Sequence, residues 1–399
     1  MLLYVTTDEG KERKARPLHT IPDTITLLYD LGMREHDRAA LLLQPEGNVW
    51  ADTPDWRFDR EVIRIALFLR ERLHVPRAQR VTIFGPLRPL WLSADFAALG
   101  LGAVSLGVSH LLRDDEVVAA LNEAEVRVAI ATDGASTSRL LGLRPRVATL
   151  EFVIGPEGNA DDKVFLPLAR LLEYGATLDT AERANRFRLD ARAVGADDPA
   201  CWHFGVGDAA RGVRLTHREA MARVRSHLRR LPAQTGDLAY LEGEAVTLEA
   251  RFAWYAFTGD GYTTMVMGRP GRPFEDVRDL RPAKILATPG WLEGLWSRLD
   301  VEPAGKVERF GASVPGLGAL GAGARARRLR RALHGCAGDR IRWIEPLGAL
   351  PGELKQKLSQ AVTVAESAGP IPVPGPDVGG GRPEAPADAG APQLHPKAT

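Results

Sequence analysis

The sequence predicts an α/β fold with two helix-covered sheets of mixed and parallel strands. Short apolar runs of strand length alternate with amphipathic stretches of helix length from residue 21 to residue 369. Strands that alternate with helices pair in parallel, because each helical crossover returns the chain to the same end of the sheet. The chain has 399 residues, of which 45% are hydrophobic and 26% charged. This composition is typical of a globular protein.

The first alternating block extends to residue 190. Residues 57–73 (RFDREVIRIALFLRERL) place Val62, Ile65 and Leu69 on one face, which predicts a helix. Further strands are predicted at 39–43, 80–84, 103–108 and 126–131, and further helices at 91–101 and 114–124.

A second block covers residues 191–369. Its predicted strands are 200–204, 283–287 and 340–344, and its predicted helices are 216–231, 289–299 and 351–360. Residues 1–20 are polar and are expected to form a loose arm, whereas residues 370–399 are rich in proline and glycine and are expected to be disordered. We therefore expect an arm (1–20), two α/β subdomains (21–190 and 191–369) and a tail (370–399).

Composition excludes several classes of protein. The formal net charge is +1, whereas a dedicated nucleic-acid binder needs an excess of cations, so we expect no nucleic-acid partner. Two cysteines, Cys201 and Cys336, provide neither a disulfide framework nor a four-cysteine zinc site. The nine histidines show no metal-binding spacing, and we expect no metal site. The N-terminus lacks a secretory pattern, which favours a cytoplasmic location.

One apolar segment is long enough to span a membrane. Residues 90–112 carry only Asp95 as a charge. Gly100 and Gly102 stand where a helix ends and a turn begins, which favours a buried helix followed by a buried strand. We therefore expect no transmembrane span.

Two stretches concentrate arginine, at residues 223–230 and 325–333. They are typical either of a surface that binds lipid headgroups, nucleotides or RNA, or of a solvated helix face. The balanced net charge favours the solvated face. Peripheral attachment to a membrane through these helices remains a weaker alternative.

Local motifs provide no complete catalytic site. Residues 316–321 fit Gly-x-Gly-x-x-Gly, but Pro315 precedes them and the nearest acidic residue at a strand end, Glu345, is too distant, so a flexible loop is predicted. Residues 258–261 (TGDG) predict a turn. No Gly-x-Ser-x-Gly elbow is present.

Residues 197–217 (DDPACWHFGVGDAARGVRLTH) resemble the phosphate-loop segment of the adenylate-forming superfamily, specifically that of the long-chain acyl-CoA synthetases. In that family a strand runs into a Ser/Thr- and Gly-rich loop ending Pro-Lys-Gly, and Thr-His then opens a helix. Residues 57–71, 80–108, 280–289 and 340–353 are similar to further family segments in the same order. The resemblance covers residues 21–369 and implies sheets packed as in the large N-terminal domain of those enzymes.

The loop departs from the family pattern at the positions that bind phosphate. Its hydroxyls are replaced by Gly205, Val206 and Asp208, and Arg211 stands at the lysine position. The negative charge of Asp208 opposes phosphate binding, and a guanidinium is a planar fork rather than a point charge. The resemblance thus implies a vestigial nucleotide site with no catalytic residue. Its members are Gly205, Gly207, Asp208, Arg211, Gly212 and Thr216.

The downstream Tyr-Gly-x-Thr-Glu motif of the family is reduced to residues 364–369, in which Glu366 is the remnant. The family's small C-terminal domain is not recognised after it. We therefore expect a non-catalytic acyl-CoA synthetase-like protein that requires no cofactor and binds an acyl ligand, a second copy or an active paralogue. The alternative is an active AMP-forming acyl-acid ligase that uses ATP with Mg²⁺, with Arg211 in the lysine's role and the C-terminal domain supplied by another chain.

Overall fold

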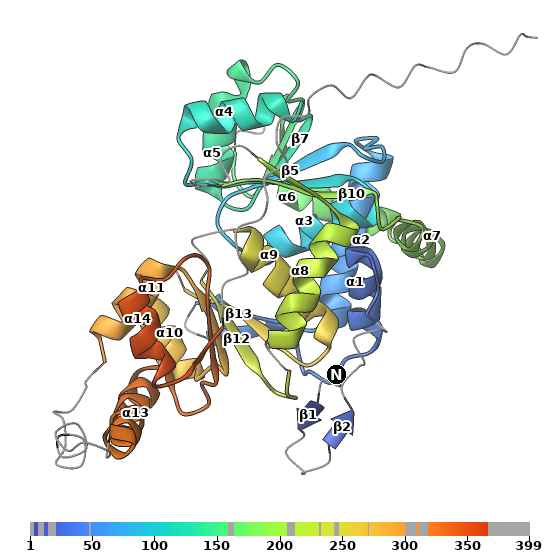
Figure 1. Cartoon of the computed structure of the whole chain (residues 1–399). Helices are drawn as coiled ribbons and strands as arrows, with labels where there is room; N and C mark the ends of the chain where they lie inside the picture. The colour runs from blue at the N-terminus through green and yellow to red at the C-terminus, as the bar shows by residue number, and fades with distance from the viewer. Residues whose placement is uncertain are drawn as a thin grey trace, which may run out of the picture. The chain divides into compact units, whose positions relative to one another are not determined.

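A computed structural model describes residues 4–6, 12–14, 21–47, 49–158, 163–205, 212–230, 233–242, 247–269, 271–299, 309 and 318–365. The chain divides into two units, residues 1–369 and 370–399, and every described residue belongs to the first. Two seven-stranded sheets with helices packed on them form this unit (Figure 1). The predicted α/β class, with two helix-covered mixed and parallel sheets, is confirmed.

The first sheet has the strand order β11-β10-β6-β5-β7-β8-β9. Every neighbouring pair is parallel except β10 and β11, which form an antiparallel hairpin. Its strands are β5 (Arg80–Phe84), β6 (Val104–Val108), β7 (Val128–Ala131), β8 (Phe152–Gly155), β9 (Phe165–Pro167), β10 (Pro199–Phe204) and β11 (Val213–Thr216).

The second sheet has the order β16-β15-β14-β12-β13-β3-β4. It is parallel apart from β4, which is antiparallel to β3. Its strands are β3 (Leu42–Glu46), β4 (Val49–Thr53), β12 (Leu238–Leu241), β13 (Thr264–Met267), β14 (Lys284–Ala287), β15 (Trp343–Pro346) and β16 (Thr363–Val364). In the N-terminal arm, β1 (Tyr4–Thr6) and β2 (Glu12–Lys14) pair with each other.

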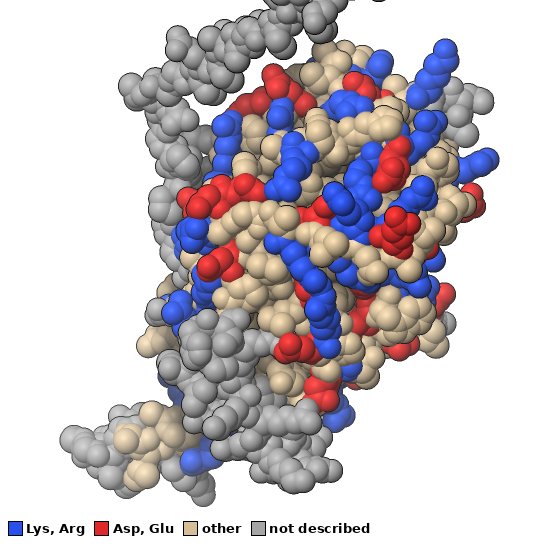
Figure 2. All heavy atoms as spheres, turned by 90° about the vertical axis from the view of Figure 1, so that its right-hand side faces the viewer, with Lys and Arg blue, Asp and Glu red and all other residues tan. Residues whose placement is uncertain are grey.

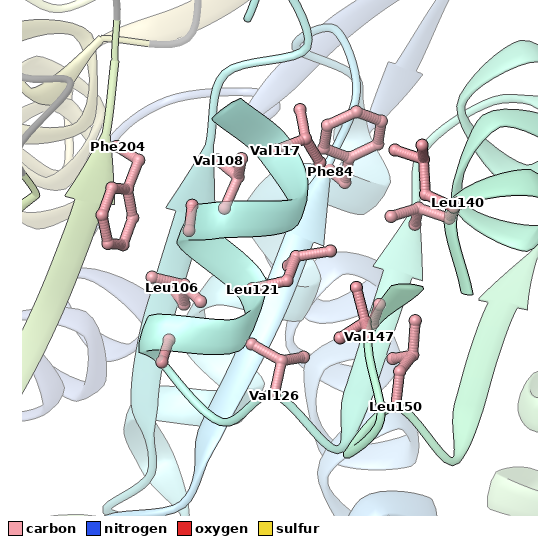
Figure 3. Close-up of a cluster of buried hydrophobic side chains, with 14 of the residues drawn as sticks. Phe84, Leu106, Val108, Val117, Leu121, Val126, Leu140, Val147, Leu150 and Phe204 are labelled. Atoms are coloured by element: carbon pink, nitrogen blue, oxygen red, sulfur yellow. The ribbon is translucent and has the colours of Figure 1, made fainter. Parts of the chain in front are cut away.

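The helices are α1 (Ile25–Arg34), α2 (Asp55–Glu71), α3 (Pro89–Gly100), α4 (Asp114–Glu123), α5 (Gly134–Leu143), α6 (Leu168–Leu178), α7 (Ala181–Arg192), α8 (His217–Arg230), α9 (Leu248–Asp260), α10 (Pro273–Leu280), α11 (Pro289–Ser297), α13 (Gly318–Ala337) and α14 (Gly352–Ser359). Helix α4 packs Val117 and Leu121 against the first sheet (Figure 3). Burial of such side chains contributes about 25 cal/mol per Å² of apolar surface.

Each large sheet takes strands from both sides of residue 190. Strands β10 and β11 extend the first sheet, and β3 and β4 extend the second. The expected division at residue 190 therefore does not coincide with a division between the sheets. The physical reason is that a sheet edge presents unpaired N–H and C=O groups, which can pair with strands from distant parts of the chain.

The apolar segment 90–112 forms α3 and β6, which confirms the predicted buried helix followed by a buried strand. Within the part of the chain that the structure describes, no helix has the length and apolar character needed to cross a membrane.

Two local predictions are wrong. Gly318–Gly321, expected in a loop, begins α13, because the buried side chains Leu329 and Leu333 anchor this helix in the core of the second sheet. Residues 316 and 317 lie outside the described residues. The turn expected at residues 258–261 is instead the last turn of α9, and Gly261 ends the helix with φ +76°.

The arginine-rich stretch 223–230 lies on α8 and is only partly solvated. The Arg225 guanidinium donates to the carbonyl of Pro22 at 2.9 Å, and that of Arg230 donates to the Glu345 carboxylate at 2.9 Å. Arg229 is exposed. Arginines of α8 therefore hold other segments of the chain in place.

A fully buried ion pair joins α9 to α3 and β6. Arg251 Nη2 donates to Asp95 Oδ1 at 2.8 Å and to Ser105 Oγ at 2.9 Å, and Tyr255 donates to Asp95 Oδ2 at 2.6 Å. All four side chains have relative exposures of 0%. Burying a charge is unfavourable unless its partner is in place, so each member of this network depends on the others.

We predict that D95N and R251M each lower the free energy of unfolding by about 3–5 kcal/mol, because each leaves a buried group without its partner. The double variant D95N/R251M is expected to be less destabilised than the sum of the two single changes. Urea denaturation measures all three values. D197N, in which an exposed pair with Arg218 is lost, is the control and is expected to change stability little. If the losses in free energy of the two single variants add exactly in the double variant, Asp95 and Arg251 are not coupled and the prediction is wrong.

Candidate functional site

The hairpin of β10 and β11 carries the residues that the sequence predicts for nucleotide binding. His203 pairs opposite Val213, and the connecting loop starts at Gly205 and ends at Gly212. Three predicted loop residues, Gly207, Asp208 and Arg211, lie outside the described residues, as does Glu366. The structure thus defines the two ends of the predicted phosphate loop.

Two aromatic side chains close the base of this loop. Trp202 and Phe204 are buried, with ring centroids 5.2 Å apart. Gly212 has φ +75°, and a Cβ there would lie 2.5 Å from Trp202 Nε1 and 2.6 Å from Phe204 Cε1. Only glycine fits this position, because a side chain would collide with both rings. The Arg214 guanidinium lies 3.9 Å from the Trp202 ring centroid, as in a cation–π contact.

Thr216 opens α8. Its hydroxyl lies 3.0 Å from Glu219 Oε2, and its backbone N–H donates to the same oxygen at 2.8 Å. The Glu219 N–H in turn donates to Thr216 Oγ1 at 3.3 Å. This reciprocal arrangement is a capping box, which satisfies N–H groups at the helix start. The Thr216 hydroxyl is therefore engaged by the helix that follows the loop.

His217 joins the start of α8 to the start of α1. Its Nδ1 accepts the N–H of Ile25 at 3.3 Å. Burial lowers the pKa of His217 to about 4, and Asp198 opposes this shift. Burial, reinforced by Arg251, lowers the pKa of His203 to about 3. Both imidazoles are neutral at neutral pH, so they act here as uncharged parts of the interior.

The far end of α8 contacts the second sheet. His227 Nδ1 lies 3.1 Å from a carboxylate oxygen of Glu345, which stands on β15, and Arg230 donates to the same carboxylate. The helix that follows the predicted loop is thus tied to the other sheet. Sequence analysis missed this contact because 118 residues separate His227 from Glu345 and no local pattern joins them.

The described residues contain no cluster of metal-ligating side chains. Among them, no three His, Cys, Asp or Glu side chains gather closely enough to hold a metal ion. At the described ends of the loop, Gly205 is buried and Gly212 is partly buried. Thr216 supplies the hydroxyl of the family pattern that lies nearest to Gly212 in sequence. This hydroxyl already caps α8.

We predict that His217 makes stability depend on pH below neutrality. Its pKa is about 4 in the folded state and about 6.5 in an unfolded chain. Between pH 4 and pH 6.5 the unfolded state binds more protons than the folded state, so the free energy of unfolding falls as the pH is lowered. For this group the loss is about 2 kcal/mol at pH 4.5. H217N, whose amide oxygen can accept the Ile25 N–H, is expected to show a smaller loss between pH 7 and pH 4.5 in urea denaturation.

His74 is exposed with φ +50°, a conformation that asparagine tolerates, so H74N is the matched control and is expected to retain the pH dependence of the parent protein. An H217N variant with an unchanged pH profile would show that the protonation of this imidazole is not what destabilises the fold.

Comparisons with known proteins agree with this architecture. The family model of the AMP-binding enzymes matches residues 57–345. The long-chain-fatty-acid–CoA ligases FadD15 of Mycobacterium bovis and Mycobacterium tuberculosis are each 29% identical over 170 residues, which cover 42% of this chain. The matched region spans only 27% of the length of these curated relatives.

Solved structures show the same fold. The N-terminal domain of FACL13 from Mycobacterium tuberculosis aligns with a TM-score of 0.56 and 15% identity, over 86% of this chain and 74% of that one. A long-chain-fatty-acid-CoA ligase (FadD1) from Archaeoglobus fulgidus aligns with a TM-score of 0.63 and 12% identity, over 86% of this chain and 63% of that one. The resemblance to the large N-terminal domain of acyl-CoA synthetases is confirmed. Because the family model matches well over half of the sequence, the chain belongs to the AMP-binding enzyme family.

Proposed function

We propose that this chain is a degenerate acyl-CoA synthetase-like domain that does not catalyse adenylation. It acts as a module that binds an acyl ligand or regulates a partner in the cytoplasm. The partner is an active acyl-CoA synthetase paralogue or a second copy of this chain. The proposal rests on family membership together with the chemistry of one loop.

The observation that carries the proposal is the loss of phosphate-binding groups around the β10–β11 loop. The hydroxyl of Thr216 caps α8. By sequence, Asp208 adds a negative charge to the loop, and Arg211 replaces the lysine expected from the resemblance. Removing one positioned donor from a transition state typically costs about 3 kcal/mol, a factor of about a hundred in rate. Several such losses together leave little adenylation activity.

The alternative is an active AMP-forming ligase whose C-terminal domain comes from another chain. Gly205 and Gly212 at the loop ends and the cation of Arg211 favour it. In this alternative, ATP and magnesium are required, and the loop backbone replaces the missing hydroxyls.

ATP–pyrophosphate exchange separates the two functions. We expect no exchange above background with a panel of fatty and aryl acids, because the loop cannot hold a triphosphate in the reactive position. Exchange that exceeds background and disappears in R211A would establish the active ligase and overturn the proposal. R214A is the matched control. It removes another arginine of the same hairpin, but one that lies on β11 and stacks on Trp202.

A second prediction tests the electrostatics of the loop. D208N is expected to bind ATP about tenfold more tightly than the parent protein at low salt, because it removes a negative charge beside the phosphates. Calorimetric titration measures both affinities. D197N, which removes an exposed acid paired with Arg218, is the control and is expected to leave ATP affinity unchanged. Equal ATP affinity in all three proteins would contradict a charge effect at Asp208.

A further inference from the structure

A cavity of about 330 Å³ lies beneath α7, bounded by α1, α2 and α3. Its lining includes Tyr29, Asp59, Phe96 and Arg188, one from each of these helices, and no described residue of the β10–β11 hairpin. Ligand pockets for small molecules begin at about this volume. The cavity is therefore large enough for a small molecule, and neither described end of the predicted phosphate loop belongs to its lining.

The interior wall of this α7 cavity is aromatic. The rings of Tyr29 and Phe96 have centroids 4.6 Å apart and are inclined by 31°. Phe187 of α7 is buried against Gly100, where a Cβ would lie only 2.4 Å from its Cζ atom. Phe96 and Phe187 are each 3% exposed. With so little of these rings exposed, a ligand ring can meet only their edges, and aromatic pairs favour such edge-on contact.

The rim of the cavity is charged, and its carboxylates already accept hydrogen bonds from neighbouring side chains. Asp59 accepts hydrogen bonds from Tyr29 at 2.9 Å and from Arg188 at 2.6 Å, one on each oxygen. Burial raises the pKa of Tyr29 well above its usual value, with the Asp59 charge adding to the shift, so this hydroxyl remains a donor.

The second rim carboxylate is occupied in the same way. Both oxygens of Asp30 accept from Arg192, at 3.1 and 3.2 Å, and Arg34 lies 3.2 Å from one of them. Two arginines of the lining, Arg34 and Arg188, thus face two aspartates, and Arg192 pairs with Asp30 from outside the lining. Figure 2 shows basic and acidic side chains interspersed over the face of the molecule on which α7 lies. Because each guanidinium carries five N–H donors, this rim has donors in excess of acceptors.

We propose that the α7 cavity binds a small aromatic carboxylate, with its ring against Tyr29, Phe96 and Phe187 and its carboxylate toward the arginines of the rim. A cation of the same shape would have to displace an arginine from Asp30 or Asp59, whereas an anion adds to the donors already present. All lining residues that the structure describes belong to α1, α2, α3 or α7, and the proposal does not depend on the function proposed for the loop.

The test is a ¹⁹F NMR titration of the full chain with 4-fluorobenzoate. Saturable binding is expected, and 4-fluorobenzyl alcohol and 4-fluorobenzylamine are each expected to bind at least about tenfold more weakly, because they lack the charge that the rim selects. Equal binding of the alcohol, or tighter binding of the amine, overturns the proposal.

Two variants locate the site. M33W places a larger side chain on the lining of the cavity and is expected to weaken fluorobenzoate binding by at least about tenfold. R34Q removes a rim cation whose side chain is 55% exposed, so the fold is retained, and is expected to weaken binding several-fold. R186Q is the matched control, because Arg186 is also an exposed arginine paired with an aspartate four residues along its helix but is absent from the lining.

Binding that R34Q leaves unchanged overturns the proposal even if M33W does not fold. Binding that is lost in R211A but kept in R34Q would place the acid at the β10–β11 loop, which refutes the α7 site and supports ligand binding at the loop. Loss in R34Q with full retention in R211A supports the α7 site whatever the outcome of pyrophosphate exchange.

Discussion

The buried pair of Arg251 and Asp95 constrains the arrangement of the helices and strands around the site. Arg251 belongs to α9, and Asp95 to α3, and Ser105 and Tyr255 complete their hydrogen bonding. Cys201, on the strand that leads into the predicted phosphate loop, lies 3.7 Å from the Tyr255 hydroxyl. A buried charge without its partner cannot be stabilised by water. Helices α9 and α3 must therefore pack in the one register that brings Arg251 and Asp95 together.

Helix α9 also contacts the second sheet, since the ammonium of Lys284 on β14 lies 5.3 Å from the ring centroid of Phe257. One helix therefore touches strands of both sheets. The contact of His227 and Arg230 with Glu345 provides a second link, from the helix after the loop to β15. Between them, these contacts fix the strands that bear the loop relative to the remainder of the fold.

Much of the α/β pattern could be predicted from the sequence. Strand β5 begins and ends at the predicted residues, and α2, α3 and α4 lie within two residues of their predicted limits. Helix α9 escaped prediction because it is buried on nearly all sides and lacks the polar stripe that marks an amphipathic helix. The start of α13 was mistaken for a loop because glycine and alanine there give no periodic signal, and Leu329 and Leu333 decide the outcome through tertiary packing.

The candidate site was less accessible to sequence reasoning. Motif order identified the loop and its bounding glycines, because these belong to one contiguous stretch. The partners of Asp95, His217 and Glu345 are 156, 192 and 118 residues away, and no local pattern specifies such pairs. The α7 cavity was missed for the same reason, since its wall is assembled from four helices that are separate in sequence.

Side chains at the base of the β10–β11 hairpin pack at the two ends of its loop. Trp202, Phe204 and Gly212 pack closely at the two ends of the loop, where β10 and β11 pair. A loop carried on a base of this kind can be exchanged at little cost to the core, as in antibody loops carried on a rigid framework. The same property makes the hairpin a suitable acceptor for grafted peptide loops.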